Sequence, residues 1–157
     1  MKTAVFDCMV FLQAATNSNG PARACLELVE TGHIRLLVSP EILQEVEEVL
    51  RRPKIRAAFP QLSDEHVADF IARVKELVIL QEETPLVFHL PRDPDDEPYI
   101  NLAIETAPAY LVSRDKDLLS LMDDDDFRRR YPDLTILSPA AFLQQVRTAL
   151  AAPPRDG

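Results

Sequence analysis

Short apolar runs alternate along the chain with segments in which apolar residues recur every three or four positions. The runs Thr3–Phe6, Ile34–Val38 and Tyr110–Ser113 are rich in aliphatic and β-branched residues, and each predicts a buried strand. Weaker strand patterns occur near Val78–Leu80 and at Thr135–Leu137. Buried strands separated by helical segments predict an α/β fold with a mainly parallel central sheet.

The helical segments carry recognisable start and stop signals. Ser39 and Pro40 supply an N-cap and a first-turn proline for a helix that continues to about Arg52, where Pro53 interrupts it. The segment Thr84–Pro98 is rich in proline and aspartate, which favours a loop. The other helices are expected between positions 21 and 31, 63 and 77, 99 and 106, from about 116, and between 139 and 151.

The length of the chain limits the number of domains. A chain of 157 residues buries one sizeable core, whereas two domains would each be small and marginal. We therefore expect one domain over residues 1–152 and a disordered tail over residues 153–157. No stretch approaches the roughly 20 consecutive apolar residues of a membrane-spanning helix, and Cys8 and Cys25 suggest no disulfide framework, so we expect a cytoplasmic protein without a membrane partner.

The net charge of -9 bears on the class of ligand. General attraction to nucleic acid needs clustered Lys and Arg, so this charge argues against it. The charge is compatible with a nuclease if many acids line one metal pocket while basic side chains guide the phosphate backbone from outside. Glycine occurs only at positions 20, 32 and 157, which excludes a phosphate-cradling loop, and the scattered histidines lack the spacing of a zinc site.

Four acids fall where a parallel sheet would bring them to one edge. Asp7 ends the first strand, and Asp115 follows the strand near Val112. Asp96 precedes a helix, and Glu45 lies one turn into the helix after the second strand. Sites in such sheets gather beyond the carboxyl ends of the strands. Converging carboxylates repel one another without a cation, and Mg²⁺ and Mn²⁺ prefer oxygen ligands, so the pattern predicts a metal site suited to phosphodiester hydrolysis.

Each acid also has an ordinary structural explanation. A helix acid such as Glu45 is usually solvated, and Asp93 or Asp95 could take the place of Asp96 at the end of the loop. Asp117 fits a helix cap or a group that supports the ligands. The four acids at positions 123–126 are expected to form a solvated turn rather than a metal cluster.

Four segments, in this order along the chain, resemble the PIN domain family. They run from Val5 to Leu12, from Ser39 to Val46, from Arg92 to Asp96 and from Leu111 to Leu119. The likeness is closest to the toxin components of toxin-antitoxin systems, the VapC-like ribonucleases. It implies a three-layer α/β/α sandwich around the parallel sheet. It also implies an endoribonuclease that uses Mg²⁺ or Mn²⁺ and leaves a 5′ phosphate and a 3′ hydroxyl.

The resemblance assigns roles to individual residues. The four acids of the family, which bind the metal and carry catalysis, are matched by Asp7, Glu45, Asp96 and Asp115. The residues expected to support or orient these ligands are Ser113, Asp93, Asp117 and Met9, the last standing where many members have an asparagine. The basic residues that flank the acids, and so are candidates for binding substrate phosphates, are Arg92, Arg114 and Lys116.

Two other functions compete with the nuclease at the level of sequence. A haloacid dehalogenase-type phosphatase also places an aspartate after its first strand, but it needs another two positions later, where this chain has Met9. A PIN-like domain with weakened catalysis would be a binding or scaffold module held by an antitoxin-like partner, which Met9 and the acidic net charge favour. For the nuclease, the family analogy predicts an RNA substrate, a cognate antitoxin, and a homodimer that includes apolar residues near Leu86–Leu90.

Overall fold

A parallel sheet forms the centre of the protein, whose computed structural model describes residues 2–152. Within these residues it has five strands in the order β3-β2-β1-β4-β5. Their bounds are β1 (Lys2–Phe6), β2 (Ile34–Val38), β3 (Ile79–Leu80), β4 (Ala109–Val112) and β5 (Leu134–Leu137). Every described strand pairing is parallel, from Lys2↔Ile34 between β1 and β2 to Val112↔Leu137 between β4 and β5. The prediction of a mainly parallel sheet is confirmed.

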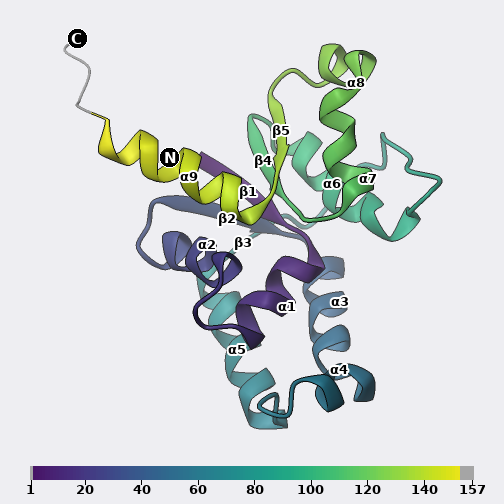
Figure 1. The fold of residues 1–157 in the computed structure, drawn as a ribbon. Coiled ribbons are helices and arrows are strands. Elements are labelled where there is room, and N and C mark those ends of the chain that lie inside the picture. The colour runs from purple at the N-terminus through teal and green to yellow at the C-terminus, as the bar shows by residue number, and fades with distance from the viewer. Residues whose placement is uncertain (1, 153–157) are drawn as a thin grey trace.

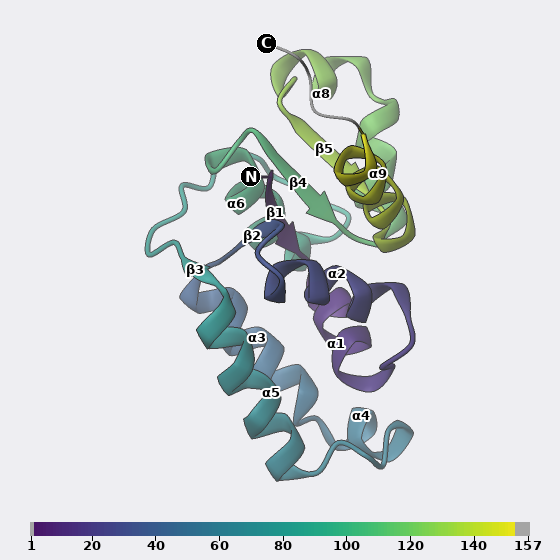
Figure 2. The same cartoon turned by 90° about the vertical axis from the view of Figure 1, so that its left-hand side faces the viewer.

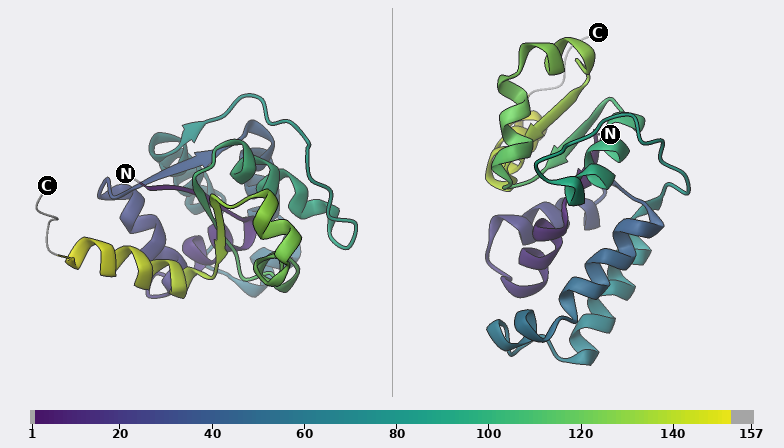
Figure 3. Two further views of the ribbon diagram at one scale, coloured as in Figure 1. Left: turned by 90° about the horizontal axis from the view of Figure 1, so that it is seen from above. Right: turned by 90° about the vertical axis from the view of Figure 1, so that its right-hand side faces the viewer.

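Helices pack on both faces of this sheet (Figures 1 and 3). One face carries α2 (Pro21–Glu30) and α9 (Pro139–Ala151), which contact each other, with α1 (Cys8–Thr16) beside α2. The other face carries α6 (Glu97–Glu105), which packs on β1 and β4. This arrangement is the expected three-layer α/β/α sandwich.

The remaining helices extend this framework away from the sheet. Figure 2 shows α3 (Pro40–Leu50) and α5 (Asp64–Leu77) running side by side, with α4 (Pro53–Ala58) at their far end. After β4 come α7 (Lys116–Leu119) and α8 (Asp125–Arg130), joined by the 3-10 turn η2 (Ser120–Asp123). A second 3-10 turn, η1 (Pro94–Asp96), directly precedes α6.

Several helices begin at the carboxyl edge of the sheet, each with a side-chain cap. The Asp7 carboxylate accepts a hydrogen bond from the Val10 amide at 3.0 Å and so caps α1. Ser39 caps α3 and Ser138 caps α9 in the same way, with oxygen–nitrogen distances of 3.1 and 3.2 Å. Helix N-termini carry partial positive charge, so this edge favours anionic groups before any cation is considered.

The buried side-chain amide of Asn101 holds much of the loop between β3 and α6. Asn101, whose exposed fraction is 0%, accepts hydrogen bonds from the Val87 and Phe88 amides at 2.8 and 2.9 Å. Its amide group donates to the carbonyls of Phe88 and Glu97 at 2.8 and 2.9 Å. The side-chain oxygen of Asn101 accepts two hydrogen bonds and its NH₂ group donates two, and together they fix an irregular segment against α6. The expected loop is present, although its end folds into η1 and α6 begins at Glu97.

Three helices were not expected from the sequence. The helix α1 buries Val10, Phe11, Leu12 and Ala14, so it has no polar stripe from which its period could be read. The other two, α4 and α8, are six residues long. The acidic run is exposed, as expected, but the prediction of a simple turn is wrong: Asp124 caps α8 by accepting from Asp126 and Phe127 amides at 2.9 and 3.2 Å.

Among the helices described, none is long and apolar enough to cross a membrane. The predicted disordered tail at residues 153–157 lies outside the described part of the chain.

Candidate metal centre

A cavity of about 240 Å³ opens at the carboxyl edge of the sheet. Its lining contains the four acids that the sequence placed at this edge, which come from four separate elements. Met9 lies at the cavity with half of its side chain exposed, where it makes an apolar rim. The lining residues are Asp7, Cys8, Met9, Gln13, Glu45, Asp96, Tyr99, Arg114 and Asp115.

Asp7 is the most deeply buried of these acids, with an exposed fraction of 4%. Its position is fixed because β1 ends at Phe6 and its amide donates to the Val112 carbonyl of β4 at 3.1 Å. One carboxylate oxygen caps α1, and the other accepts a hydrogen bond from the Ser113 hydroxyl. Burial raises the pKa of Asp7, and the nearby Asp115 charge adds to this effect, while the bonds from Ser113 and Val10 oppose it.

Ser113 joins two of the acids. Its hydroxyl donates to Asp7 and accepts the Asp115 amide at 2.9 Å, and its side chain is completely buried. Asp115 in turn caps α7, with one oxygen accepting the amides of Asp117 and Leu118 at 2.8 and 3.4 Å. Each carboxylate is thus oriented by backbone amides at one oxygen.

Asp96 differs from these two because it occupies a helix N-cap position without capping the helix. Its Oδ2 atom is buried and has no hydrogen-bond partner among the described residues. One carboxylate oxygen from each of Asp93, Asp96 and Asp115 lies within 4.8 Å of the other two. Burial, followed by the proximity of Asp93 and Asp115, raises the pKa of Asp96 from 3.8 to about 8.

Glu45 faces the same cavity from α3 and stands outside that group of three. Burial raises its pKa, the charges of Asp95 and Glu41 raise it further, and the hydroxyl of Tyr99 lowers it. The neighbouring Cys8 thiol has its pKa raised to about 12, chiefly by burial and then by the charge of Glu45. A thiol with that pKa stays protonated near neutral pH, so Cys8 is not an activated nucleophile.

The donor set fits a hard divalent cation. Carboxylate oxygens are the ligands that Mg²⁺ and Mn²⁺ prefer, and four of the residues that line the cavity carry them. The unpartnered Oδ2 of Asp96 is the strongest single indication, because a buried carboxylate oxygen is unfavourable without a positive or hydrogen-bonding partner. A cation bound among Asp93, Asp96 and Asp115 would remove this repulsion.

The three basic residues predicted to bind substrate phosphates lie at different distances from the cavity. Arg114 is exposed and lines the cavity, whereas Arg92 and Lys116 are exposed but do not line it. Asp93 belongs to the group of three carboxylates, where it is placed to be a ligand itself and not only to support the ligands. The cap of α7 comes from Asp115, while Asp117 contributes its backbone amide.

Tyr99 and Gln13 also line the cavity but were not singled out from the sequence. A tyrosine within a helix that carries Ile100, Leu102 and Ala103 is indistinguishable from a core residue by its pattern alone. The one available signal was its spacing, since Tyr99 follows Asp96 by three positions and so lies on the same side of the helix.

Comparison with known proteins agrees with this geometry. The family model described as "PIN domain" matches residues 3–117, a span that includes the predicted acids. An uncharacterized protein of Methanocaldococcus jannaschii, MJ1680, is 29% identical over 143 residues, covering 90% of this chain and 89% of that protein. Since the family model spans well over half of the sequence, the chain belongs to the PIN domain family, whose members are generally metal-dependent nucleases.

Proposed function

We propose that this protein is a Mg²⁺- or Mn²⁺-dependent endoribonuclease that hydrolyses phosphodiester bonds of RNA. In this proposal Asp7, Glu45, Asp96 and Asp115 form the catalytic and metal-binding set, with Asp93 as a further ligand. The observation that carries it is the group of three carboxylates in which a buried Asp96 oxygen lacks any partner among the described residues. Within the PIN family such a set is most simply explained as the cation site of the nuclease.

The residues of the chain have separate tasks in this mechanism. A divalent cation, when bound, supplies positive charge for the phosphoryl oxygens and lowers the pKa of a water nucleophile. Ser113 keeps Asp7 and Asp115 at a fixed separation through its two hydrogen bonds. The Asp96 carboxylate makes no capping hydrogen bond to α6, so it stays directed toward Asp93 and Asp115. Arg114, exposed beside the acids, would contact a substrate phosphate first, with Arg92 and Lys116 farther out.

The biological setting is a second part of the proposal. We place residues 1–152 in one nuclease domain that acts in the cytoplasm as the toxin of a toxin-antitoxin system, with a cognate antitoxin and a homodimer as its assemblies. The support is the order of the four PIN motifs and the match to the family. Growth arrest on induced expression of the wild-type protein, but not of Asp7→Asn, would test the toxin role. Normal growth with active enzyme in the cells would contradict it.

A weakened, RNA-binding PIN module is the alternative that one observation favours. Met9 presents a half-exposed apolar side chain at the cavity, where it offers no hydrogen bond to a cation ligand or to water. Loss of such support typically lowers metal affinity or activity by about 10–100-fold. This alternative therefore predicts metal binding and RNA binding with little turnover.

The deciding experiment is cleavage of a mixed RNA substrate with Mn²⁺ or Mg²⁺, with and without EDTA. Asp7→Asn tests the site, because asparagine still caps a helix but cannot supply the same charge. Asp69→Asn is a matched control, since Asp69 is exposed on α5 and outside the carboxylate cavity. Cleavage that requires both metal and Asp7 is the expected result. Unchanged cleavage by folded Asp7→Asn would exclude the proposed site, and metal binding without turnover would favour the binding module.

A further inference from the structure

Tyr99 places a neutral hydroxyl among the carboxylates of the proposed nuclease site. It lies on α6, it has an exposed fraction of 1%, and it lines the cavity together with Glu45 and Cys8. Its hydroxyl oxygen is buried and makes no hydrogen bond to any described residue. Buried tyrosine hydroxyls are normally paired, so the position calls for an explanation other than packing.

The cavity around this hydroxyl is lined by acceptors, among them the Glu45 and Asp7 carboxylates. A tyrosine hydroxyl is protonated near neutral pH, and burial, followed by the neighbouring Cys8 thiol and Glu45 carboxylate, raises the pKa of Tyr99 further. Tyr99 is therefore a donor, not a base. Glu45 contributes a carboxylate to the same cavity from α3, so an acceptor is available to this donor.

The burial of the hydroxyl also decides how it can act. An oxygen without solvent contact cannot touch an RNA phosphate that enters from the open side of the cavity. On the same lining both oxygens of Asp7 already accept hydrogen bonds, and the Cys8 sulfur is only a weak acceptor. The Glu45 carboxylate is a strong acceptor that remains available. The hydroxyl hydrogen rotates freely about the C–O bond, so a small adjustment of Glu45 is enough to complete the bond.

We propose that Tyr99 is a positioning residue that donates a hydrogen bond to Glu45 and fixes this carboxylate for divalent-cation binding. The proposal rests on the nuclease function proposed above and adds a residue to its site. The hydroxyl is unpaired without the cation and paired when Glu45 is drawn toward it. Tyr99 thus lowers the stability of the cation-free protein and raises its affinity for the cation.

Tyr99→Phe tests this idea because it removes one oxygen and keeps the ring. Without divalent cations, the variant is expected to melt at the wild-type temperature or up to about 4 °C above it. Its affinity for Mn²⁺, measured by calorimetric titration, is expected to fall by about tenfold or more. In the cleavage assay at saturating Mn²⁺, kcat should fall while KM for RNA stays the same, because the hydroxyl does not touch the substrate.

Tyr131→Phe is the matched control. The Tyr131 hydroxyl is also buried and unpaired among the described residues, but it lies beside Arg128 and Pro132 and outside the carboxylate cavity. This variant should show a similar thermal shift and bind Mn²⁺ with wild-type affinity.

The outcomes separate the two proposals. Wild-type Mn²⁺ affinity in Tyr99→Phe, or a loss of stability in the cation-free variant, overturns the role of Tyr99 and leaves the nuclease proposal standing. Absence of Mn²⁺ binding and of cleavage in the wild-type protein overturns both. Weaker Mn²⁺ binding in Tyr99→Phe alone, with stability kept, establishes the positioning role.

Discussion

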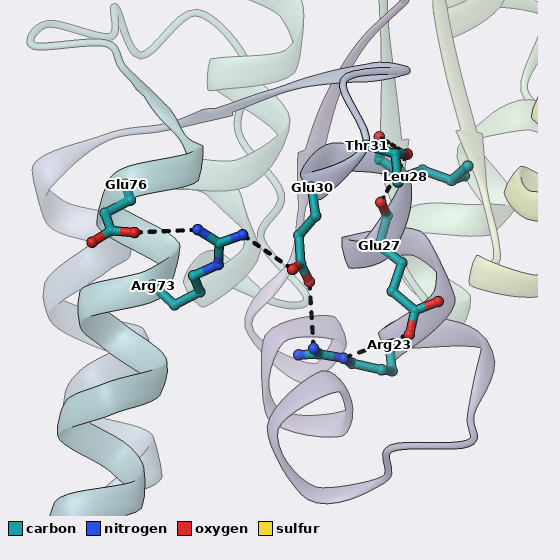
Figure 4. A network of polar contacts seen from close by, with 7 residues as sticks. All are labelled: Arg23, Glu27, Leu28, Glu30, Thr31, Arg73 and Glu76. Carbon is teal, nitrogen blue, oxygen red and sulfur yellow. Dashed lines mark hydrogen bonds and ion pairs between the residues drawn. The ribbon is translucent and has the colours of Figure 1, made fainter.

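Two clusters of side chains in this protein both contain several carboxylates, but their negative charge is balanced differently. Figure 4 shows the first, which connects α2 and α5 and alternates acids with arginines: Arg23, Glu27, Glu30, Arg73 and Glu76. The second is the group of carboxylates at the edge of the sheet: Asp93, Asp96 and Asp115. In the first cluster each carboxylate has a cationic partner within 4.0 Å, whereas no ion pair of the described chain involves the second.

The difference shows where charge serves stability and where it serves binding. Glu30 bridges two helices, since it pairs with Arg23 at 3.4 Å and with Arg73 at 3.2 Å. Its charge is balanced before any ligand arrives. Asp96 instead is held next to two other acids, so its cost in free energy is relieved only by a proton or a cation. Removal of one negative charge should therefore have opposite consequences in the two clusters.

The largest expected effect is the loss of cleavage in Asp96→Asn. A bound cation contributes several kcal/mol to transition-state stabilisation, and each 1.36 kcal/mol corresponds to a factor of ten. We therefore expect kcat/KM for RNA to fall by about 1,000-fold. The same variant should unfold in EDTA at a denaturant concentration equal to or above that of the wild type, because the repulsion with Asp93 and Asp115 is reduced.

A destabilised Asp96→Asn protein in EDTA would contradict this account, even if its activity were lost. It would mean that Asp96 supports the fold and that its neighbours do not oppose its charge. Asp69→Asn, which removes an exposed acid of α5, controls for the general effect of one less negative charge.

The second effect is stabilisation of the wild-type protein by Mn²⁺. A ligand that binds only the folded state at 100 times its Kd adds about 2.7 kcal/mol to the free energy of unfolding. Thermal unfolding with increasing Mn²⁺ should show this rise in the wild type and a much smaller one in Asp96→Asn. An equal rise in both proteins would place the cation elsewhere.

The third effect is a dependence of stability on pH in the absence of divalent cations. The pKa of Asp96 is about 8 in the folded protein and 3.8 ordinarily, so the folded state binds more protons between these values. Stability is therefore expected to fall as the pH rises from about 4 to 8. Because Asp96 is partly exposed, solvent screening limits its share to about 1–2 kcal/mol.

Urea unfolding in EDTA at several pH values would measure this contribution. The difference between wild type and Asp96→Asn isolates Asp96 from the many other acids. The expected result is a gap that widens with pH in favour of the variant. A gap that stays constant would show that Asp96 has an ordinary pKa.

The parallel sheet, and the edge of it at which the acids meet, could both be predicted from the sequence. The apolar runs ending at Phe6 and Val112 fixed the strand ends, and Asp7 and Asp115 follow from them. The sequence favoured Asp96 and left Asp93 and Asp95 as substitutes, because a loop rich in proline has no period that orients its side chains. The structure turns Asp93 and Asp96 toward Asp115, and Asp95 is exposed.

Two further features depend on contacts between distant segments. The helix α1 is apolar around much of its surface because α2 and α3 cover it, so its pattern resembles a buried strand as much as a helix. The role of Tyr99 depends on the cavity that it shares with Cys8 of α1 and Glu45 of α3. Neither residue is close to Tyr99 in sequence.

The smallest effect is expected from Glu30→Gln in the balanced cluster. The substitution keeps the shape of the side chain but removes the charge that pairs with Arg23 and Arg73. Because these ion pairs are near the surface, the free energy of unfolding should fall by only about 0.5–1 kcal/mol. The loss should shrink in about 1 M NaCl, where the Debye length is about 3 Å. Urea unfolding at low and high salt measures both quantities, and RNA cleavage should stay at the wild-type rate. If Glu30→Gln instead stabilised the protein in EDTA as Asp96→Asn is expected to, the two clusters would not differ in charge balance. The unpartnered carboxylate oxygen of Asp96 would then no longer indicate a cation site.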